Sequence, residues 1–214
     1  MIKTFSPINI FLLLIILAIF VFGLVTIPAD QLVAVHWNIN GEVDFELPAN
    51  LALWIGPLEC LVVILGVYFA HKNMPTEEFA AAKSLLEASV SIAFGAGLLV
   101  QSVITLSASG YVLDVPQIAT IFIGFVMLIL GNYLPKSQAN RAAGIRLPWT
   151  MRSETVWTKT HHFAGKCFMA AGMVILLAGV INFAAPVILI IALATVLLCV
   201  GLVGFYSYSI RELT

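Results

Sequence analysis

The chain has 214 residues, of which 61% are hydrophobic and only 10% are charged. With a mean hydropathy of +1.06 it is too apolar for a soluble globular domain, and an all-α polytopic membrane protein is predicted. The formal net charge of −1 is nearly neutral and by itself says nothing about nucleic acid; no direct nucleic-acid partner is expected.

Six apolar windows are long enough to cross a bilayer as transmembrane helices, which need about 17–25 residues each. A lipid-exposed backbone must satisfy its own hydrogen bonds, so each window is expected to be helical. The windows are Ile8–Ile27, Leu51–Ala70, Ala88–Ser107, Val115–Leu134, Cys167–Phe183 and Pro186–Tyr206.

These windows form one integral membrane domain in three segments of chain. Residues 1–70 hold the first two helices and the first loop (residues 28–50), residues 71–134 hold the third and fourth helices, and residues 135–214 hold the last two. The first window is longer than a typical signal-peptide core and no small-x-small cleavage site follows it, so this helix is expected to be retained.

All the Lys and Arg residues fall on one side of the membrane when the amino terminus is placed in the cytoplasm. They are Lys3, Lys72, Lys83, Lys136, Arg141, Arg146, Arg152, Lys159, Lys166 and Arg211. The connections on the other side, residues 28–50, 108–114 and 182–185, contain no Lys or Arg. The positive-inside rule therefore predicts that both termini are cytoplasmic.

The first loop (residues 28–50) is acidic and contains a turn signal. Asn40-Gly41 lies between Val, Ile, Phe and Trp residues, so a small extracellular hairpin or an ordered loop is expected. Its acidic residues have no basic partner nearby: Asp30, Glu42, Asp44 and Glu46. Their spacing does not match an EF-hand, so a solvated acidic turn is favoured over a calcium site, and no metal or other cofactor is expected.

The connection after the second window predicts where the third helix begins. Glu77 and Glu78 follow Pro75-Thr76, and acidic residues favour the positive, amino-terminal end of a helix. The third helix is therefore expected to start on the cytoplasmic side and to continue into the membrane.

The fourth connection, the signature segment (residues 135–163), is the longest polar stretch of the chain. Its first part, KSQANRAA, is expected to form one or two helical turns that stop at Gly144. Proline disfavours helix in the residue before it, so Pro148 predicts an extended approach at Leu147.

The second part of the signature segment has the pattern of a capped helix. Ser153 is expected to cap a helix that runs into the fifth window. Helical spacing then places Trp157, His161 and Gly165 on one face.

Two interpretations of the signature segment remain open at this level. Its cations and tryptophans suit a rim that contacts anionic headgroups and the membrane interface. Its glycine stop, its Arg-x-Pro-Trp-Thr corner and its capped helix instead indicate a fixed conformation, which a rim does not require.

Two polar side chains are expected within the membrane. Glu59 lies about 12 Å into the second window from the outer side, and Gln101 lies about 9 Å into the third. Because the two depths are similar, these side chains are predicted to face each other or a shared cavity. A carboxyl group inside a membrane span is a functional candidate, although a packing role explains it equally well.

The chain resembles the SdpI immunity-protein family, six-helix bacterial membrane proteins that protect cells against a secreted sporulation-delaying toxin peptide. The first loop is similar to the domain of unknown function that precedes this family's signature, at His36, Asn38, Gly41 and Asp44. The signature itself is matched by Asn132, Asn140, Gly144, Arg146, Pro148, Trp149, Thr150, Trp157, Thr160 and His161. Two positions depart from the family pattern, Ala34 in place of a proline and His162 in place of a basic residue, which leaves the toxin's identity open.

This resemblance implies a non-enzymatic protein of the bacterial plasma (inner) membrane. Its expected partners are membrane lipid, a secreted toxin peptide to which it gives immunity, and a cytosolic repressor protein that some members hold at the inner face. The resemblance leaves the oligomeric state unpredicted.

Two other functions can be weighed from the residues alone. Glu59, with Gln101, suits a small proton-coupled transporter, but the chain shows no obvious inverted repeat. A membrane enzyme would use a residue set of His71, Glu154, His161 and His162. Adjacent histidines on a helix point about 100° apart and rarely share one ion, and no nucleophile with its base is visible, so the enzyme is disfavoured.

Overall fold

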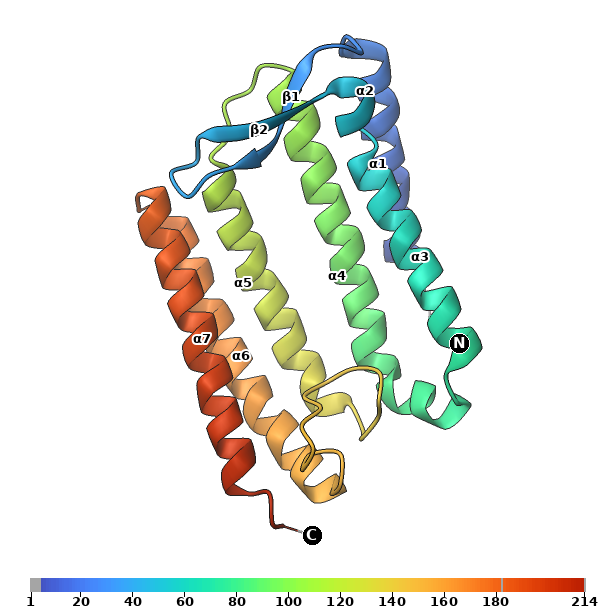
Figure 1. Cartoon of the computed structure of the whole chain (residues 1–214), viewed down its shortest axis with the longest axis vertical. Coiled ribbons are helices and arrows are strands. Elements are labelled where there is room, and N and C mark those ends of the chain that lie inside the picture. The colour runs from blue at the N-terminus through green and yellow to red at the C-terminus, as the bar shows by residue number, and fades with distance from the viewer. Residues whose placement is uncertain (1–4, 182, 214) are drawn as a thin grey trace. The chain divides into compact units, whose positions relative to one another are not determined.

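A computed structural model describes residues 5–181 and 183–213 of the chain (Figure 1). Within these residues, six helical segments are long and apolar enough to cross a membrane, as the sequence predicts. Lys3 lies outside the described residues. The elements are α1 Pro7–Thr26, β1 Leu32–Trp37, β2 Val43–Pro48, α2 Ala49–Ala52, α3 Ile55–Asn73, α4 Thr76–Ala108, α5 Val115–Tyr133, η1 Leu134–Lys136, α6 Glu154–Ile181 and α7 Ala185–Ser209.

The second span differs from the continuous helix that the sequence predicts. A short helix, α2, ends at Ala52, and α3 begins at Ile55 after a tight turn in which the Trp54 N–H donates to the Leu51 carbonyl. Pro57 in the first turn of α3 has no N–H, so the break costs fewer hydrogen bonds there than elsewhere in the span.

The helices expose most of their apolar surface. Only 22–39% of the residues in each spanning window are buried within the structure. Apolar side chains that no protein group covers are stable in lipid and costly in water, so this exposure agrees with a multi-pass membrane protein.

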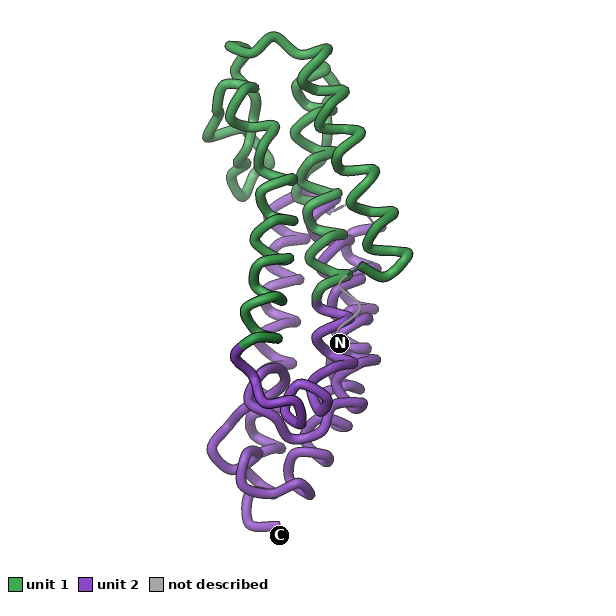
Figure 2. The backbone as a smooth tube through the Cα atoms, turned by 90° about the vertical axis from the view of Figure 1, so that its right-hand side faces the viewer, with its two compact units in different colours: residues 1, 3–72, 90–116 green, residues 2, 73–89, 117–214 purple. Residues whose placement is uncertain are grey.

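The described chain forms two compact units, which Figure 2 colours separately. Unit 1 contains residues 5–72 and 90–116, and unit 2 contains residues 73–89 and 117–213 without residue 182. Helix α4 contributes to both, because its first turns belong to unit 2 and the remainder to unit 1.

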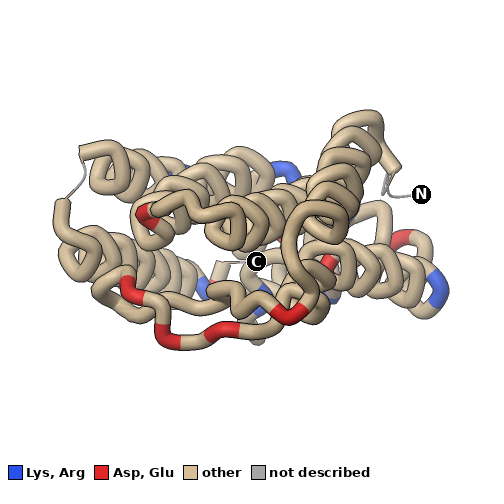
Figure 3. The backbone as a smooth tube through the Cα atoms, turned by 90° about the horizontal axis from the view of Figure 1, so that it is seen from above, with Lys and Arg blue, Asp and Glu red and all other residues tan. Residues whose placement is uncertain are grey.

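Unit 1 holds the expected hairpin in the first loop. Strands β1 and β2 pair antiparallel, with Val33 opposite Leu47, and Gly41 in the turn adopts a φ of 82°. Val33 is buried in a cluster with Phe20 of α1 and Ile104 of α4, so the base of the hairpin is anchored on the ends of two helices. Figure 3 shows acidic positions, in red, along this hairpin.

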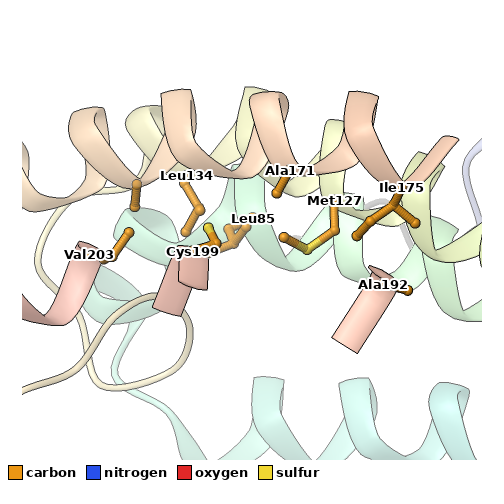
Figure 4. Close-up of a cluster of buried hydrophobic side chains, with 9 residues drawn as sticks. Leu85, Met127, Leu134, Ala171, Ile175, Ala192, Cys199 and Val203 are labelled. Atoms are coloured by element: carbon orange, nitrogen blue, oxygen red, sulfur yellow. The ribbon is translucent and has the colours of Figure 1, made fainter. Parts of the chain in front are cut away.

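The core of unit 2 is a layer of apolar side chains from helices α4, α5, α6 and α7 (Figure 4). Its buried members are Leu85, Met127, Leu134, Ala164, Ala171, Ile175, Ala192, Cys199 and Val203. On α6 the buried members of this core begin at Ala164, directly after the signature segment.

Helices α5 and α6 approach each other at glycines spaced seven residues apart. A Cβ added at Gly165 would lie 2.7 Å from the Gly131 carbonyl oxygen, and one added at Gly172 would lie 2.8 Å from the Gly124 carbonyl oxygen. Small residues at such positions allow the two backbones to touch, as is common between membrane helices. We call these four glycines the α5–α6 seam.

Candidate functional site

The start of α6 brings two of the predicted signature residues into a buried pair. Ser153 caps the helix, because its Oγ accepts the Val156 N–H at 3.3 Å, as predicted. Trp157 and His161, one turn apart, are both fully buried, and their rings stack with centroids 4.0 Å apart. The predicted common face of Trp157 and His161 is therefore confirmed.

Both ring nitrogens of His161 are engaged by the backbone. Nδ1 lies 2.8 Å from the Trp157 carbonyl oxygen, and the Ile145 N–H donates to Nε2 at 2.9 Å. A nitrogen that accepts an N–H carries no proton, so His161 is neutral with its proton on Nδ1. The ring thus fixes the chain direction at Ile145, sixteen residues earlier in the sequence.

Gly144 has a φ of 119°, a backbone conformation that side chains disfavour. A Cβ at this position would lie 2.6 Å from His161 Nε2 and 2.9 Å from Trp157 Cη2. Two independent features therefore favour glycine here: the positive φ of the backbone and the rings packed against it. The sequence predicts a helix stop at this residue, whereas the structure uses it for close approach to α6.

The helical turns predicted for KSQANRAA are wrong beyond η1, and the Asn140 side chain explains why. Its Oδ1 accepts the N–H groups of Ala142 and Ala143, both at 2.8 Å, and its Nδ2 donates to the Gln138 carbonyl at 2.7 Å. These bonds replace the helical ones, because an Asn side chain offers nearby N–H groups an alternative acceptor. Asn140 is 2% exposed, so this turn is internal.

Thr150 closes the loop after Gly144. Its hydroxyl oxygen accepts the Leu147 N–H at 2.9 Å and lies 2.7 Å from the Ile145 carbonyl, to which the hydroxyl can donate. The side chain is fully buried. We call the set Asn140, Gly144, Ile145, Thr150, Trp157 and His161 the signature corner.

Helix α7 is tied to the signature segment through Ser207. The Trp149 Nε1–H donates to Ser207 Oγ at 2.7 Å, and the Thr160 hydroxyl lies 3.3 Å from the same oxygen. The Trp149 ring also meets Tyr208 edge-on. Sequence reasoning missed Ser207, which lies between Tyr206 and Tyr208 just beyond the sixth window.

Burial contradicts the headgroup-rim interpretation for Trp157. The indole is fully buried, and its Nε1–H donates to the Ser137 carbonyl at 3.0 Å, a group of the same segment. A tryptophan that anchors a protein in headgroups keeps its ring at the lipid boundary. Of the two interpretations left open, the structure supports the fixed conformation.

Three predicted signature residues lie on the surface. Arg146 is exposed, and its guanidinium donates to the Arg141 carbonyl. Pro148 is exposed on the same loop, and Asn132 is exposed near the end of α5, outside the signature corner. Arg141 pairs with Glu78 at 3.7 Å, a contact that brings the start of α4 beside the loop.

The predicted first-loop residues form an ordered turn. Asn38 Oδ1 accepts the N–H groups of Asn40 and Glu42 at 2.9 and 3.0 Å, and the Asn38 amide donates to the Glu42 carboxylate. His36 and Asp44 face each other across the two strands through Nδ1 and Oδ1. His36, Asn38, Asp44 and the φ of Gly41 thus have structural roles in one exposed hairpin.

The two intramembrane polar side chains lie on one contact between α3 and α4. A Cβ added at Gly97 would lie 3.1 Å from Glu59 Oε2, and one added at Gly56 would lie 2.6 Å from Gln101 Oε1. The carboxyl and amide groups therefore occupy neighbouring turns of the same helix pair. The prediction that they share an environment agrees with this placement.

Two of the residues weighed for an enzyme, the adjacent histidines of α6, have different surroundings. Among the described residues, no group of three or more His, Cys, Asp or Glu side chains could hold a metal ion. His162 is exposed, whereas the adjacent His161 is buried with both nitrogens in use.

Comparison with known proteins finds a similarity over the part of the chain that contains these contacts. Residues 136–207 match the SdpI/YfhL protein family. Over 99 residues the chain is 27% identical to the Immunity protein SdpI of Bacillus subtilis (strain 168), a match that covers 46% of this chain and 48% of that relative. The chain thus matches about half the length of this relative, and no solved structure matches the chain.

The family match and the geometry converge on one region. Residues 136–207 include every member of the signature corner as well as Ser207, to which the signature segment is tied. Helices α6 and α7, which carry Trp157, His161 and Ser207, are two of the membrane-spanning segments. Through this region the chain is similar to the SdpI/YfhL protein family.

Proposed function

We propose that this chain is an immunity protein of the bacterial plasma membrane that gives resistance to a secreted toxin peptide. The observation that carries this proposal is the signature corner, which lies within the family match and fixes the loop that carries the exposed Arg146. The similarity to the Immunity protein SdpI supports the immunity role. Both nitrogens of His161 are already engaged by the backbone, so the function we infer for the corner is binding.

The hairpin is the surface that we propose for the toxin. Its exposed side chains combine acidic residues with apolar ones such as Ile39 and Phe45. Such a surface complements a peptide that is apolar and cationic, because like charges would repel an acidic one. With both termini in the cytoplasm, as the positive-inside rule predicts, the hairpin faces the medium from which the toxin comes.

The signature segment is the surface that we propose for an intracellular partner. Arg146, Arg152 and Lys159 are exposed on it, while Trp157 and His161 are buried. A rigid basic surface suits the docking of a cytosolic repressor protein, because a preorganised site loses less conformational entropy on binding. Toxin at the hairpin would then change the repressor's occupancy of the signature segment.

The test is survival of a toxin-sensitive bacterium that expresses this protein and is challenged with the sporulation-delaying peptide. We expect protection relative to an empty vector, and loss of protection in the triple variant Arg146→Gln, Trp149→Phe and His161→Leu at equal membrane abundance. Absence of protection by the native chain at equal expression would contradict the immunity function.

Single variants separate the exposed side chains from the scaffold. Arg146→Gln removes an exposed cation beside the corner, and Lys166→Gln removes an exposed cation of α6 outside it. Trp149→Phe deletes the donor to Ser207, and Trp54→Phe is its matched control in unit 1. We expect Arg146→Gln and Trp149→Phe to lower protection more than their controls do. An equal loss of protection in each variant and its control would contradict the role assigned to the corner.

A second candidate is a small proton-coupled transporter, which the position of Glu59 beside α4 favours. A carboxyl group inside a span is the usual carrier of such a proton. Glu59→Gln cannot take up or release a proton, so it would abolish coupled transport. A Glu59→Gln protein with full protection at several pH values would contradict this candidate and leave the immunity proposal intact.

A further inference from the structure

The side-chain amide of Gln101 is a buried polar group of unit 1 with an unsatisfied hydrogen-bond acceptor. Gln101 is fully buried, and its Nε2 lies 3.4 Å from the Thr105 hydroxyl oxygen. Among the described residues, its Oε1 has no hydrogen-bond partner. A buried acceptor without a donor is costly, so this position calls for one.

Glu59 is a polar side chain on the same helix contact. Its Oε2 lies against α4 at Gly97, one turn before Gln101, and the Gln101 amide lies against α3 at Gly56, three residues before Glu59. Residues one turn apart on a helix have Cβ atoms about 5–6 Å apart, so rotation of the two side chains would bring the Glu59 carboxyl to the Gln101 amide. The two glycines allow this close approach of α3 and α4.

Among the described residues of unit 1, no Lys or Arg lies near enough to pair with a Glu59 carboxylate. Helix α1 and residues 90–108 of α4 contain no Asp, Glu, Lys, Arg or His. On α3 the other titratable groups are the adjacent thiol of Cys60 and, toward the far end, Tyr68, His71 and Lys72. Lys72 is thirteen residues from Glu59, or about 20 Å along the helix. Without such a cation among the described residues of unit 1, an ionised carboxylate at this position would be unfavourable inside a membrane.

We propose that Glu59 is held as the neutral carboxylic acid and that its hydroxyl donates a hydrogen bond to Gln101 Oε1. The ligand of this site is a proton. A protonated carboxyl is a donor, whereas a carboxylate is only an acceptor, so the proton is what completes the buried amide. The pair then joins α3 to α4 through a single hydrogen bond that exists only while Glu59 is protonated. This inference does not depend on the immunity function.

The direct test is infrared difference spectroscopy on the whole purified protein in lipid nanodiscs at neutral pH. The C=O stretch of a protonated carboxylic acid is separate from the carboxylate bands, and solvated Asp and Glu are ionised under these conditions. We expect the spectrum of the native protein minus that of Glu59→Gln to show one protonated-acid band. Gln101→Leu should shift that band to higher frequency, because the acid loses its acceptor.

The matched control for this experiment is Ser102→Ala on the next residue of α4. It removes a hydroxyl that donates to the Leu98 carbonyl and should leave the acid band in place. Two results would overturn the proposal. Absence of a protonated-acid band in the difference spectrum would mean that Glu59 is ionised. A band that Gln101→Leu leaves unmoved would mean that the acid donates elsewhere.

Unfolding temperatures of the same proteins provide an independent test. Glu59→Gln keeps an N–H donor for Gln101, so its unfolding temperature should be near that of the native protein. Glu59→Leu leaves Gln101 Oε1 without a donor, so its unfolding temperature should be lower. The double variant Glu59→Leu with Gln101→Leu removes both partners and should recover part of the loss. Additive losses in the double variant would show that the two side chains do not interact.

Discussion

At the scale of single residues, the signature corner depends on atoms whose partners lie far along the chain. The imidazole of His161 accepts a hydrogen bond from the Ile145 N–H. The Thr150 hydroxyl accepts one from the Leu147 N–H and can donate one to the Ile145 carbonyl. The His161 and Thr150 side chains are buried, so water cannot replace a lost partner. Substitutions here are therefore expected to affect the loop's conformation rather than insertion into the membrane.

Gly144→Ala should destabilise the protein much more than a matched glycine substitution elsewhere. The new Cβ would lie 2.6 Å from His161 Nε2, and the φ of 119° is strained for alanine, which together cost about 1–3 kcal/mol or more. Gly110→Ala is the control, because Gly110 also has a positive φ of 89° but nothing within 4 Å of its Cβ. Thermal unfolding in detergent measures both, and equal losses would contradict the close packing at Gly144.

Thr150→Val should cost about 1–3 kcal/mol of unfolding free energy while keeping the side chain's shape. The substitution removes the acceptor of the Leu147 N–H and the donor to the Ile145 carbonyl, and leaves both groups without that partner. Thr150→Ser retains the hydroxyl and should cost less. Denaturant or thermal unfolding distinguishes the two variants, and a Val variant as stable as the Ser variant would refute this role of the hydroxyl.

At the scale of elements, the α5–α6 seam positions the helix that carries Trp157 and His161. Its glycines let the two backbones meet, so α6 is held along its length by close packing and at its start by the Ser153 cap. The partners in each contact, such as Gly131 with Gly165, follow from the antiparallel register of the two helices.

Gly165→Leu should separate α5 from α6 and lower the unfolding temperature markedly. Its Cβ would lie 2.7 Å from both the Gly131 carbonyl oxygen and Pro135 Cγ, and overpacking of this kind costs about 1–3 kcal/mol, occasionally more. Gly201→Leu on α7 is the control, since nothing lies within 4 Å of its Cβ. Comparable unfolding temperatures for the two variants would contradict the seam.

At the scale of the whole molecule, the distribution of charge predicts the orientation in the membrane. In a background without the native cysteines, Ile39→Cys in the hairpin turn should react with a membrane-impermeant maleimide in intact cells. Gln138→Cys in the signature segment should react only after permeabilisation, because the positive-inside rule places it in the cytoplasm. Both sites are exposed, so accessibility within the protein is matched. The reverse labelling pattern would refute the predicted orientation.

Much of the fold was predictable because it depends on local composition. Apolar length indicated the six spans, Asn40-Gly41 indicated the hairpin turn, and Ser153 indicated the start of α6. The errors arose where a side chain competed with the backbone, as at Asn140, or where a short turn broke an apolar window before Ile55. Hydrophobicity alone does not register either effect.

The sequence by itself determined that the chain crosses a membrane and which connections are basic, because hydropathy and charge are properties of short segments. Only the tertiary structure decided which polar groups meet. Trp149 reaches Ser207 across 58 residues, and His161 holds Ile145 across 16. Such pairs depend on helix register and on the close approach that glycine permits, and neither is fixed until the helices have packed.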